Sequence, residues 1–163
     1  MLYVFLTLFA AAIVAADQWT KALAAAQLTD TVDVLIPGWL ELRYTTNDGM
    51  ALSMLSGARW LFVVVGVLFV ALVIWAVAKK HITKKPELWC IAAIVGGAIG
   101  NLIDRVATGK VIDMICVPWF STFNVADIFI TVPAVLLILY ILIFDHEFLS
   151  DKPKKDASHD DPA

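Results

Sequence analysis

Two aspartates, Asp113 and Asp127, lie fourteen residues apart beside strongly apolar segments. Because a charged carboxylate is costly next to hydrocarbon, ionisable residues in such places are candidates for function. Two carboxyl groups held a few ångströms apart cannot both ionise easily, so they share one proton. Such a pair supports acid–base chemistry, in which the ionised acid takes a proton from water while the protonated acid polarises a carbonyl. Each aspartate alone would also suit an interfacial helix cap, so spacing leaves both interpretations open.

The elements that position these acids belong to a membrane protein. Of the 163 residues, 61% are hydrophobic and 17% charged, with a mean hydropathy of +0.83, whereas a soluble domain is about half apolar. No basic segment flanked by aromatics indicates a nucleic-acid partner. The scattered histidines have no metal-ligand spacing, so we expect neither a metal nor another cofactor. We place Cys90 and Cys116 near opposite membrane faces, which disfavours a disulfide.

Four apolar segments are long enough to cross a bilayer. The first lacks the basic start of a cleavable signal peptide, so we interpret it as a span. The sequence therefore predicts an all-α membrane protein with one domain at 1–145. Its transmembrane helices are expected at about 1–25, 59–79, 87–106 and 126–145.

The distribution of positive charge predicts the orientation. The segment "KKHITKK" (79–85) has four lysines, whereas the loop at 26–58 has only Arg43. Because excess Lys and Arg marks the cytoplasmic side, we expect both termini in the cytoplasm. Loops 26–58 and 107–125 would then be outside, and 146–163 would form a disordered cytoplasmic tail. Alternating apolar residues on both sides of Pro37-Gly38 predict two short strands in the first outer loop.

Polar residues near the membrane are predicted to gather at one level. At 1.5 Å per residue, Asp17 lies roughly 24 Å along the first helix and Asn101 roughly 20 Å along the third, both measured from the inner end. Asp104 and Arg105 are one turn further out, and Asp127 begins the fourth helix. This clustering at the outer leaflet favours a functional site there.

Helical spacing places several of these residues on shared faces. Asp17 and Lys21 are four apart and can pair, although a simple helix-end ion pair has the same spacing. In the segment "GGAIGNLIDR" (96–105), Gly96 and Gly100 are small residues four apart, which lets another helix approach closely. The polar residues Asn101, Asp104 and Arg105 follow them and share one helix face. Arg105 in that face is suited to order a loop through a carboxylate or a backbone carbonyl. The segment "TTNDGMALS" (45–53) supplies turn residues at Asn47, Asp48 and Gly49.

Five motifs in order resemble those of the lipoprotein signal peptidase (signal peptidase II) family of bacterial aspartic proteases. The resemblance covers about residues 14–130, through "DQWTK" (17–21), "NDGMALS" (47–53), "GNLIDR" (100–105), "VIDM" (111–114) and "FNVAD" (123–127). It implies that Asp113 and Asp127 are the catalytic pair. It also implies that the other polar and glycine residues of these motifs bind substrate or support the site: Asp17, Lys21, Asn47, Gly49, Asn101, Asp104, Arg105 and Asn124.

The resemblance further implies a substrate and a location. The expected reaction is removal of the signal peptide from a prolipoprotein with a diacylglyceryl-modified cysteine, by water activated between the aspartates and without a metal. It would take place at the outer leaflet of the bacterial inner membrane, with membrane lipids as the other partner, and we expect a monomer. The chain departs from the family pattern at Met50, Leu52 and Ile128, which bears on loop details and on inhibitor or substrate preference.

Three other functions fit the sequence less well. An ion-coupled transporter subunit needs acids at mid-membrane or along a path to both faces, but the inner halves of these helices are almost purely apolar. A non-enzymatic scaffold would explain Gly96 and Gly100 but would leave Asp113, Asp127 and Asn101 without a role. A metalloprotease is disfavoured because there is no histidine-rich ligand set.

Overall fold

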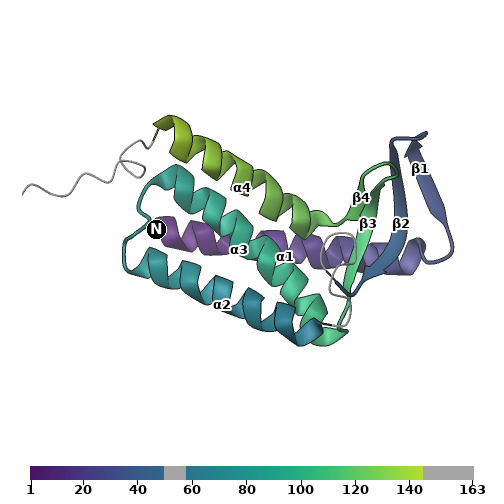
Figure 1. The fold of residues 1–163 in the computed structure, drawn as a ribbon, viewed down its shortest axis with the longest axis horizontal. Helices are drawn as coiled ribbons and strands as arrows, with labels where there is room; N and C mark the ends of the chain where they lie inside the picture. The colour runs from purple at the N-terminus through teal and green to yellow at the C-terminus, as the bar shows by residue number, and fades with distance from the viewer. Residues whose placement is uncertain (50–57, 145–163) are drawn as a thin grey trace, which may run out of the picture.

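The computed structural model describes residues 1–49 and 58–144, so Met50 and Leu52 and the predicted tail lie outside the described residues. Four long helices form a bundle, and an antiparallel sheet lies at one end of it (Figure 1). The helices are α1 (Leu2–Gln27), α2 (Arg59–Ala78), α3 (Lys85–Ala107) and α4 (Val125–Phe144), and the strands are β1 (Val32–Ile36), β2 (Leu40–Asn47), β3 (Val111–Val117) and β4 (Ser121–Phe123).

Each of the four helices is long and apolar enough to cross a membrane, which confirms the predicted number of spans. Their ends differ from the predicted ends by no more than two residues. Many side chains of α2 and α4 are exposed and apolar. A helix that is apolar on all sides is typical of a membrane span.

Helix α3 is the centre of the bundle, since it packs against all three other helices. Consecutive glycines on α3 face different neighbours. A Cβ at Gly96 would lie 2.9 Å from the Ala10 carbonyl oxygen of α1, and one at Gly97 would lie 2.5 Å from the Ala126 carbonyl oxygen of α4. The absence of side chains therefore brings α1 and α4 into backbone contact with α3, as small residues do in membrane helix pairs.

The sheet has the order β1-β2-β3-β4 with antiparallel neighbours. The two strands predicted in the first loop are present as β1 and β2. The description as all-α, with strands in that loop alone, was too narrow, because residues of the second loop form β3 and β4. The pairing of β2 with β3 joins Glu41 to Cys116, and short-range patterning does not reveal such distant partners.

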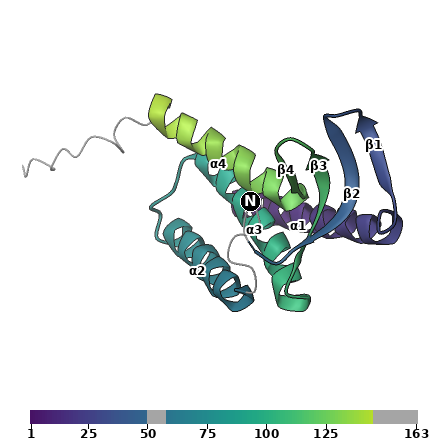
Figure 2. The same cartoon turned by 45° about the vertical axis from the view of Figure 1, so that its right-hand side comes forward.

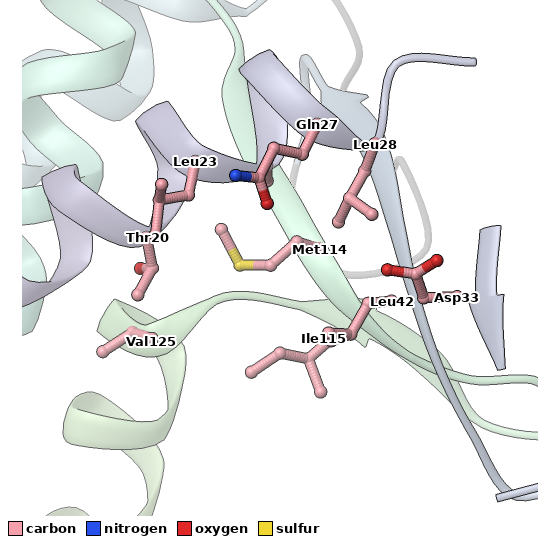
Figure 3. A pocket seen from close by; sticks show the side chains of 10 residues that line it. Thr20, Leu23, Gln27, Leu28, Asp33, Leu42, Met114, Ile115 and Val125 are labelled. Atoms are coloured by element: carbon pink, nitrogen blue, oxygen red, sulfur yellow. The ribbon is translucent and has the colours of Figure 1, made fainter. Parts of the chain in front are cut away.

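Helix α1 supports the sheet. It is six residues longer than α4, and its C-terminal turns lie beside the strands in both views (Figures 1 and 2). Ala24 and Leu28 pack against Met114 of β3 in a small apolar cluster. Beside this cluster is a hollow of about 290 Å³, into which Met114 and Leu28 project (Figure 3). These contacts hold β3 at a fixed height above the bundle.

The glycine contacts of α3 generate a stability prediction. We expect Gly97→Ala to lower the thermal midpoint in detergent, because the new methyl group overlaps the backbone of α4; overpacking of this kind typically costs about 1–3 kcal/mol. Gly66→Ala is the matched control, since its Cβ would make only an ordinary 3.4 Å contact with Leu102. Equal midpoints for the two variants would contradict the close approach of α3 and α4.

Candidate active site

The two predicted aspartates lie on different elements and line one cavity. Asp113 is the third residue of β3, and Asp127 is in the first turn of α4. The cavity has a volume of about 750 Å³, and its polar lining also includes Asn47, Asn101 and Arg105. Asp113 is 4% exposed. The structure therefore brings together, at the sheet end of the bundle, the acids that spacing alone left unpaired.

The turn that leads from α3 to β3 brings Asp113 to this place. Helix α3 ends at Ala107, and Gly109 follows in a left-handed conformation with φ 85°. The backbone N–H groups of Thr108 and Gly109 both donate to the carbonyl oxygen of Asp104. Glycine at this position after a helix costs little, since it has no Cβ to clash. The chain then reverses and enters β3 two residues later.

Asn124 joins the two acids. Its Nδ2 donates to Oδ1 of Asp113 at 2.8 Å, and its backbone N–H donates to Oδ2 of Asp127 at 3.2 Å. In return, its Oδ1 accepts from the backbone N–H of Asp127 at 2.9 Å. Asn124 precedes the first residue of α4, so this reciprocal pair is a capping box in which Asp127 is the third helical residue. The same bonds that start the helix also fix the Asp127 carboxyl group.

Asn101 holds the other oxygen of Asp127. Its Nδ2 donates to Oδ1 of Asp127 at 2.7 Å. Its Oδ1 accepts from Nζ of Lys21 at 3.0 Å and from Nδ2 of Asn124 at 3.0 Å. Both ends of the Asn101 amide are thus bonded to protein groups. These contacts describe a brace for the Asp127 carboxyl group.

Lys21 is the buried cation beneath the pair. Its side chain is 2% exposed, and its Nζ lies 2.7 Å from Asp17 Oδ2 and 2.8 Å from Asp104 Oδ2. With the bond to Asn101, all three protons of the ammonium group have acceptors. Because an ammonium group can only donate, the oxygen of Asn101 must face Lys21. The NH₂ group of Asn101 must then face Asp127, which favours Asp127 as an acceptor.

The two acids bonded to Lys21 connect two further segments, α4 and β3, and bind Gln18 of α1. Asp17 Oδ1 accepts from the backbone N–H of Ala126 in α4 at 2.9 Å. Asp104 Oδ2 accepts from the backbone N–H of Ile112 in β3 at 3.2 Å. Gln18, which sequence reasoning missed, donates from Nε2 to Asp104 Oδ1 at 2.9 Å. Asp17, Lys21 and Asp104 therefore form a buried network under the cavity, beyond the helix-end ion pair that Asp17 and Lys21 alone would make.

Asn47, Gly49 and Arg105 form the rim of the cavity. Nδ2 of Asn47 reaches Oδ2 of Asp113 at 3.4 Å, and its Oδ1 accepts from the backbone N–H of Gly49 in a local turn. Arg105 donates to the Gly49 carbonyl oxygen at 3.4 Å and lies over the ring of Phe62. This contact agrees with the expectation that Arg105 orders a loop through a backbone carbonyl.

Burial, together with the negative charge of Asp127, raises the pKa of Asp113 to about 6. Hydrogen bonds from Asn47 and Asn124 and the positive charge of Lys21 oppose this rise, because they favour the ionised form. Asp113 can therefore hold a proton at mildly acidic pH.

Sequence reasoning missed the apolar side of the cavity. It is lined by the turn before β4, by β4 and by α4, through Phe120, Phe123, Ile128, Ile130 and Val132. Ile128, noted above as a departure from the family pattern, is thus part of the cavity wall. The pairing of β3 with β4, in which Phe123 lies opposite Ile115, helps to place this wall beside α4.

Fold and site together define a multi-pass membrane protein with two carboxyl groups braced around one cavity. A model of the family described as signal peptidase (SPase) II matches residues 9–143. The chain belongs to the signal peptidase II family, and it is therefore a peptidase of the aspartic class from a bacterial membrane.

Named relatives and solved structures agree with this assignment. The chain is 38% identical to a lipoprotein signal peptidase from Symbiobacterium thermophilum, over 82% of this chain and 91% of that protein. It is 39% identical to one from Caldicellulosiruptor bescii, over 84% and 91%. Two solved structures described as bacterial membrane enzymes, at 2.3 and 1.9 Å resolution by the in meso method, superpose with TM-scores of 0.78 and 0.74. Their sequences are 28% and 29% identical to this chain. The superpositions cover 94% and 87% of this chain and 92% of each solved structure.

The buried ammonium group generates a second prediction. We expect Lys21→Met to destabilise the protein by about 3–5 kcal/mol, because removing one partner leaves two buried carboxylates without a cation. Thermal unfolding in detergent measures the effect. Lys79→Met is the matched control, since Lys79 is an exposed lysine at the opposite end of the bundle. If both variants unfold at the wild-type temperature, the Lys21 network does not hold the fold together.

Proposed function

We propose that Asp113 and Asp127 are the catalytic acids of this peptidase and that they cleave a peptide bond by activating water between them. The observation that carries the proposal is the bridge through Asn124, which ties both carboxyl groups to one side chain at the wall of one cavity. The substrate is a prolipoprotein, as the names of the relatives indicate, with the signal peptide as the part removed.

The contacts of the pair favour unequal roles. Asp127 accepts from Asn101 and from the backbone N–H of Asn124, and it lies in the first turn of α4, where the helix dipole stabilises a negative charge. We assign Asp127 as the ionised base. Asp113 has the raised pKa, and among the described residues its Oδ2 has one long contact, to Asn47. We assign Asp113 as the acid, with its proton on Oδ2.

The reaction then balances without a covalent intermediate. Asp127 takes a proton from water as the water oxygen attacks the scissile carbonyl carbon, and Asp113 gives its proton to the carbonyl oxygen. The tetrahedral diol collapses when Asp127 passes its proton to the departing amine. The C–N bond breaks, and Asp113 recovers a proton from the diol. One water is consumed, and both acids return to their starting states.

We also propose an orientation and a set of contacts. The lysine-rich connection at 79–85 lies at the end of the bundle opposite the sheet, so the positive-charge rule places the cavity near the outer leaflet (Figure 1). The lipid-modified cysteine of the substrate would lie at that level. The apolar residues of α4 that line the cavity, Ile128 and Val132 among them, fit an apolar substrate segment. We expect a monomer surrounded by membrane lipids.

Removal of either acid tests the catalytic assignment. We expect Asp113→Asn and Asp127→Asn each to lower the cleavage rate of a lipid-modified prolipoprotein by at least about 10³-fold. The reason is that both carboxyl groups take part in the same proton transfers, so one cannot take over the role of the other. Asp30→Asn, at an exposed residue before β1, is the control and should cleave at the wild-type rate. The cleavage rates are compared for purified proteins in detergent whose thermal midpoints equal that of the wild type. Substantial cleavage by either variant at the pair would contradict the mechanism.

The pH dependence tests the separate roles. Because Asp113 must be protonated, cleavage should decline as the pH rises above about 6. Asn47 donates to Asp113 and favours its ionised form, so Asn47→Ala should raise the Asp113 pKa and move this decline to higher pH. Thr46→Ala alters the exposed neighbouring residue and should leave the profile unchanged. A shift to lower pH in Asn47→Ala would show that Asp113 is not the acid.

A further inference from the structure

The two hairpins of the sheet end in four-residue turns that share a proline at the second position and a backbone bond from the fourth residue to the first. In one, Ile36, Pro37 and Gly38 lead to Trp39, whose backbone N–H donates to the Ile36 carbonyl oxygen at 3.0 Å. Proline pre-sets the second position of such a turn, and Gly38, with φ 74°, supplies the left-handed third position. Each turn thus presents a large aromatic side chain at the tip of a rigid hairpin.

The second turn repeats the pattern between β3 and β4. Val117 is followed by Pro118, Trp119 and Phe120, and the Phe120 N–H donates to the Val117 carbonyl oxygen at 2.9 Å. The sheet order places β1–β2 and β3–β4 side by side, so the two turns lie near each other at one edge of the molecule (Figures 1 and 2). Residues from distant parts of the sequence therefore meet at these tips.

The aromatic side chains of both turns are in contact with one another. The ring centroids of Trp39 and Trp119 are 5.5 Å apart at an interplanar angle of 82°, and those of Trp119 and Phe120 are 6.2 Å apart. These three residues, called here the aromatic tip, are 62%, 66% and 67% exposed. Three large aromatic side chains packed together and yet exposed are typical of a binding surface.

Chain continuity places the aromatic tip beside the membrane. Phe120 is five residues before Val125, the first residue of the span α4. It also lines the same cavity as Ile128 and Val132 of α4, which are 38% and 52% exposed. The aromatic tip is therefore continuous with the exposed apolar surface of the span α4.

We propose that the aromatic tip inserts into the boundary between headgroups and acyl chains of the surrounding bilayer and anchors the sheet there. Tryptophan suits this layer, because its ring is apolar and its indole N–H can bond to water or headgroups. Since β3 carries Asp113 and the β3–β4 turn carries Trp119 and Phe120, the anchor also sets the depth of that carboxyl group in the membrane. The occupant is lipid, not a second copy of the chain or a soluble protein.

Depth-dependent fluorescence quenching tests the proposal without any measurement of activity. The chain has six tryptophans; a variant with Phe at 19, 60, 75 and 89 keeps only Trp39 and Trp119. We expect lipid brominated near the glycerol backbone to quench this pair strongly, lipid brominated near the acyl terminus to quench it weakly, and aqueous acrylamide to have little effect. A variant that keeps only Trp60, an exposed residue in the first turn of the span α2, is the matched reference and should give the same order.

Two results would overturn the proposal. Ready quenching by acrylamide without quenching by either brominated lipid would place the tip in water. Protection from both quenchers that disappears on dilution into more lipid would identify a second copy as the occupant. If the variant with four replacements does not fold, Trp39→Phe with Trp119→Phe in the otherwise native chain gives the same information: we expect the loss of part of the shallow-lipid quenching, and an unchanged amount would contradict the anchor.

Discussion

The bonding of the Lys21 ammonium group is the constraint on which the rest of the site depends. Three acceptors, two carboxylates and one amide, surround a cation that is almost completely buried. An uncompensated charge in such a place costs several kcal/mol, so the acceptors must stay where they are. Because they belong to α1 and α3, and bond onward to the backbones of Ala126 and Ile112, one interaction fixes the relative positions of two helices, the start of α4 and a strand.

From this constraint a direction of hydrogen bonding follows. Lys21 orients the amide of Asn101, and Asn101 then presents protons to Asp127. The capping box at the start of α4 adds a backbone N–H to the same carboxyl group. Asp113, on a strand that rests on α1, receives weaker support and has a raised pKa. Two aspartates that look equivalent in sequence thus differ in chemistry, because a helix start holds one and a strand holds the other.

The sequence was sufficient for the spans, the first hairpin and the level at which polar residues gather, because these depend on local hydrophobicity, turn residues and helical rise. It was not sufficient for β3 and β4, since β2 and β3 pair across more than sixty residues. Nor did it reveal Gln18 or the apolar cavity wall at Phe120. The capping box was within reach, as an Asn three residues before an Asp at the start of an apolar run is its signature. The inward orientation of Asn101 required coordinates, because spacing gives a face and not a bonding partner.

The proton that we assign to Asp113 can be measured directly. Isotope-edited infrared difference spectroscopy of aspartate-labelled protein follows the band of a protonated carboxyl group as the pH changes. We expect one buried carboxyl band that disappears as the pH rises through about 6, and we expect it to be absent from Asp113→Asn. A band that persists in Asp113→Asn and is absent from Asp127→Asn would place the proton on the other carboxyl group and contradict the assignment of acid and base.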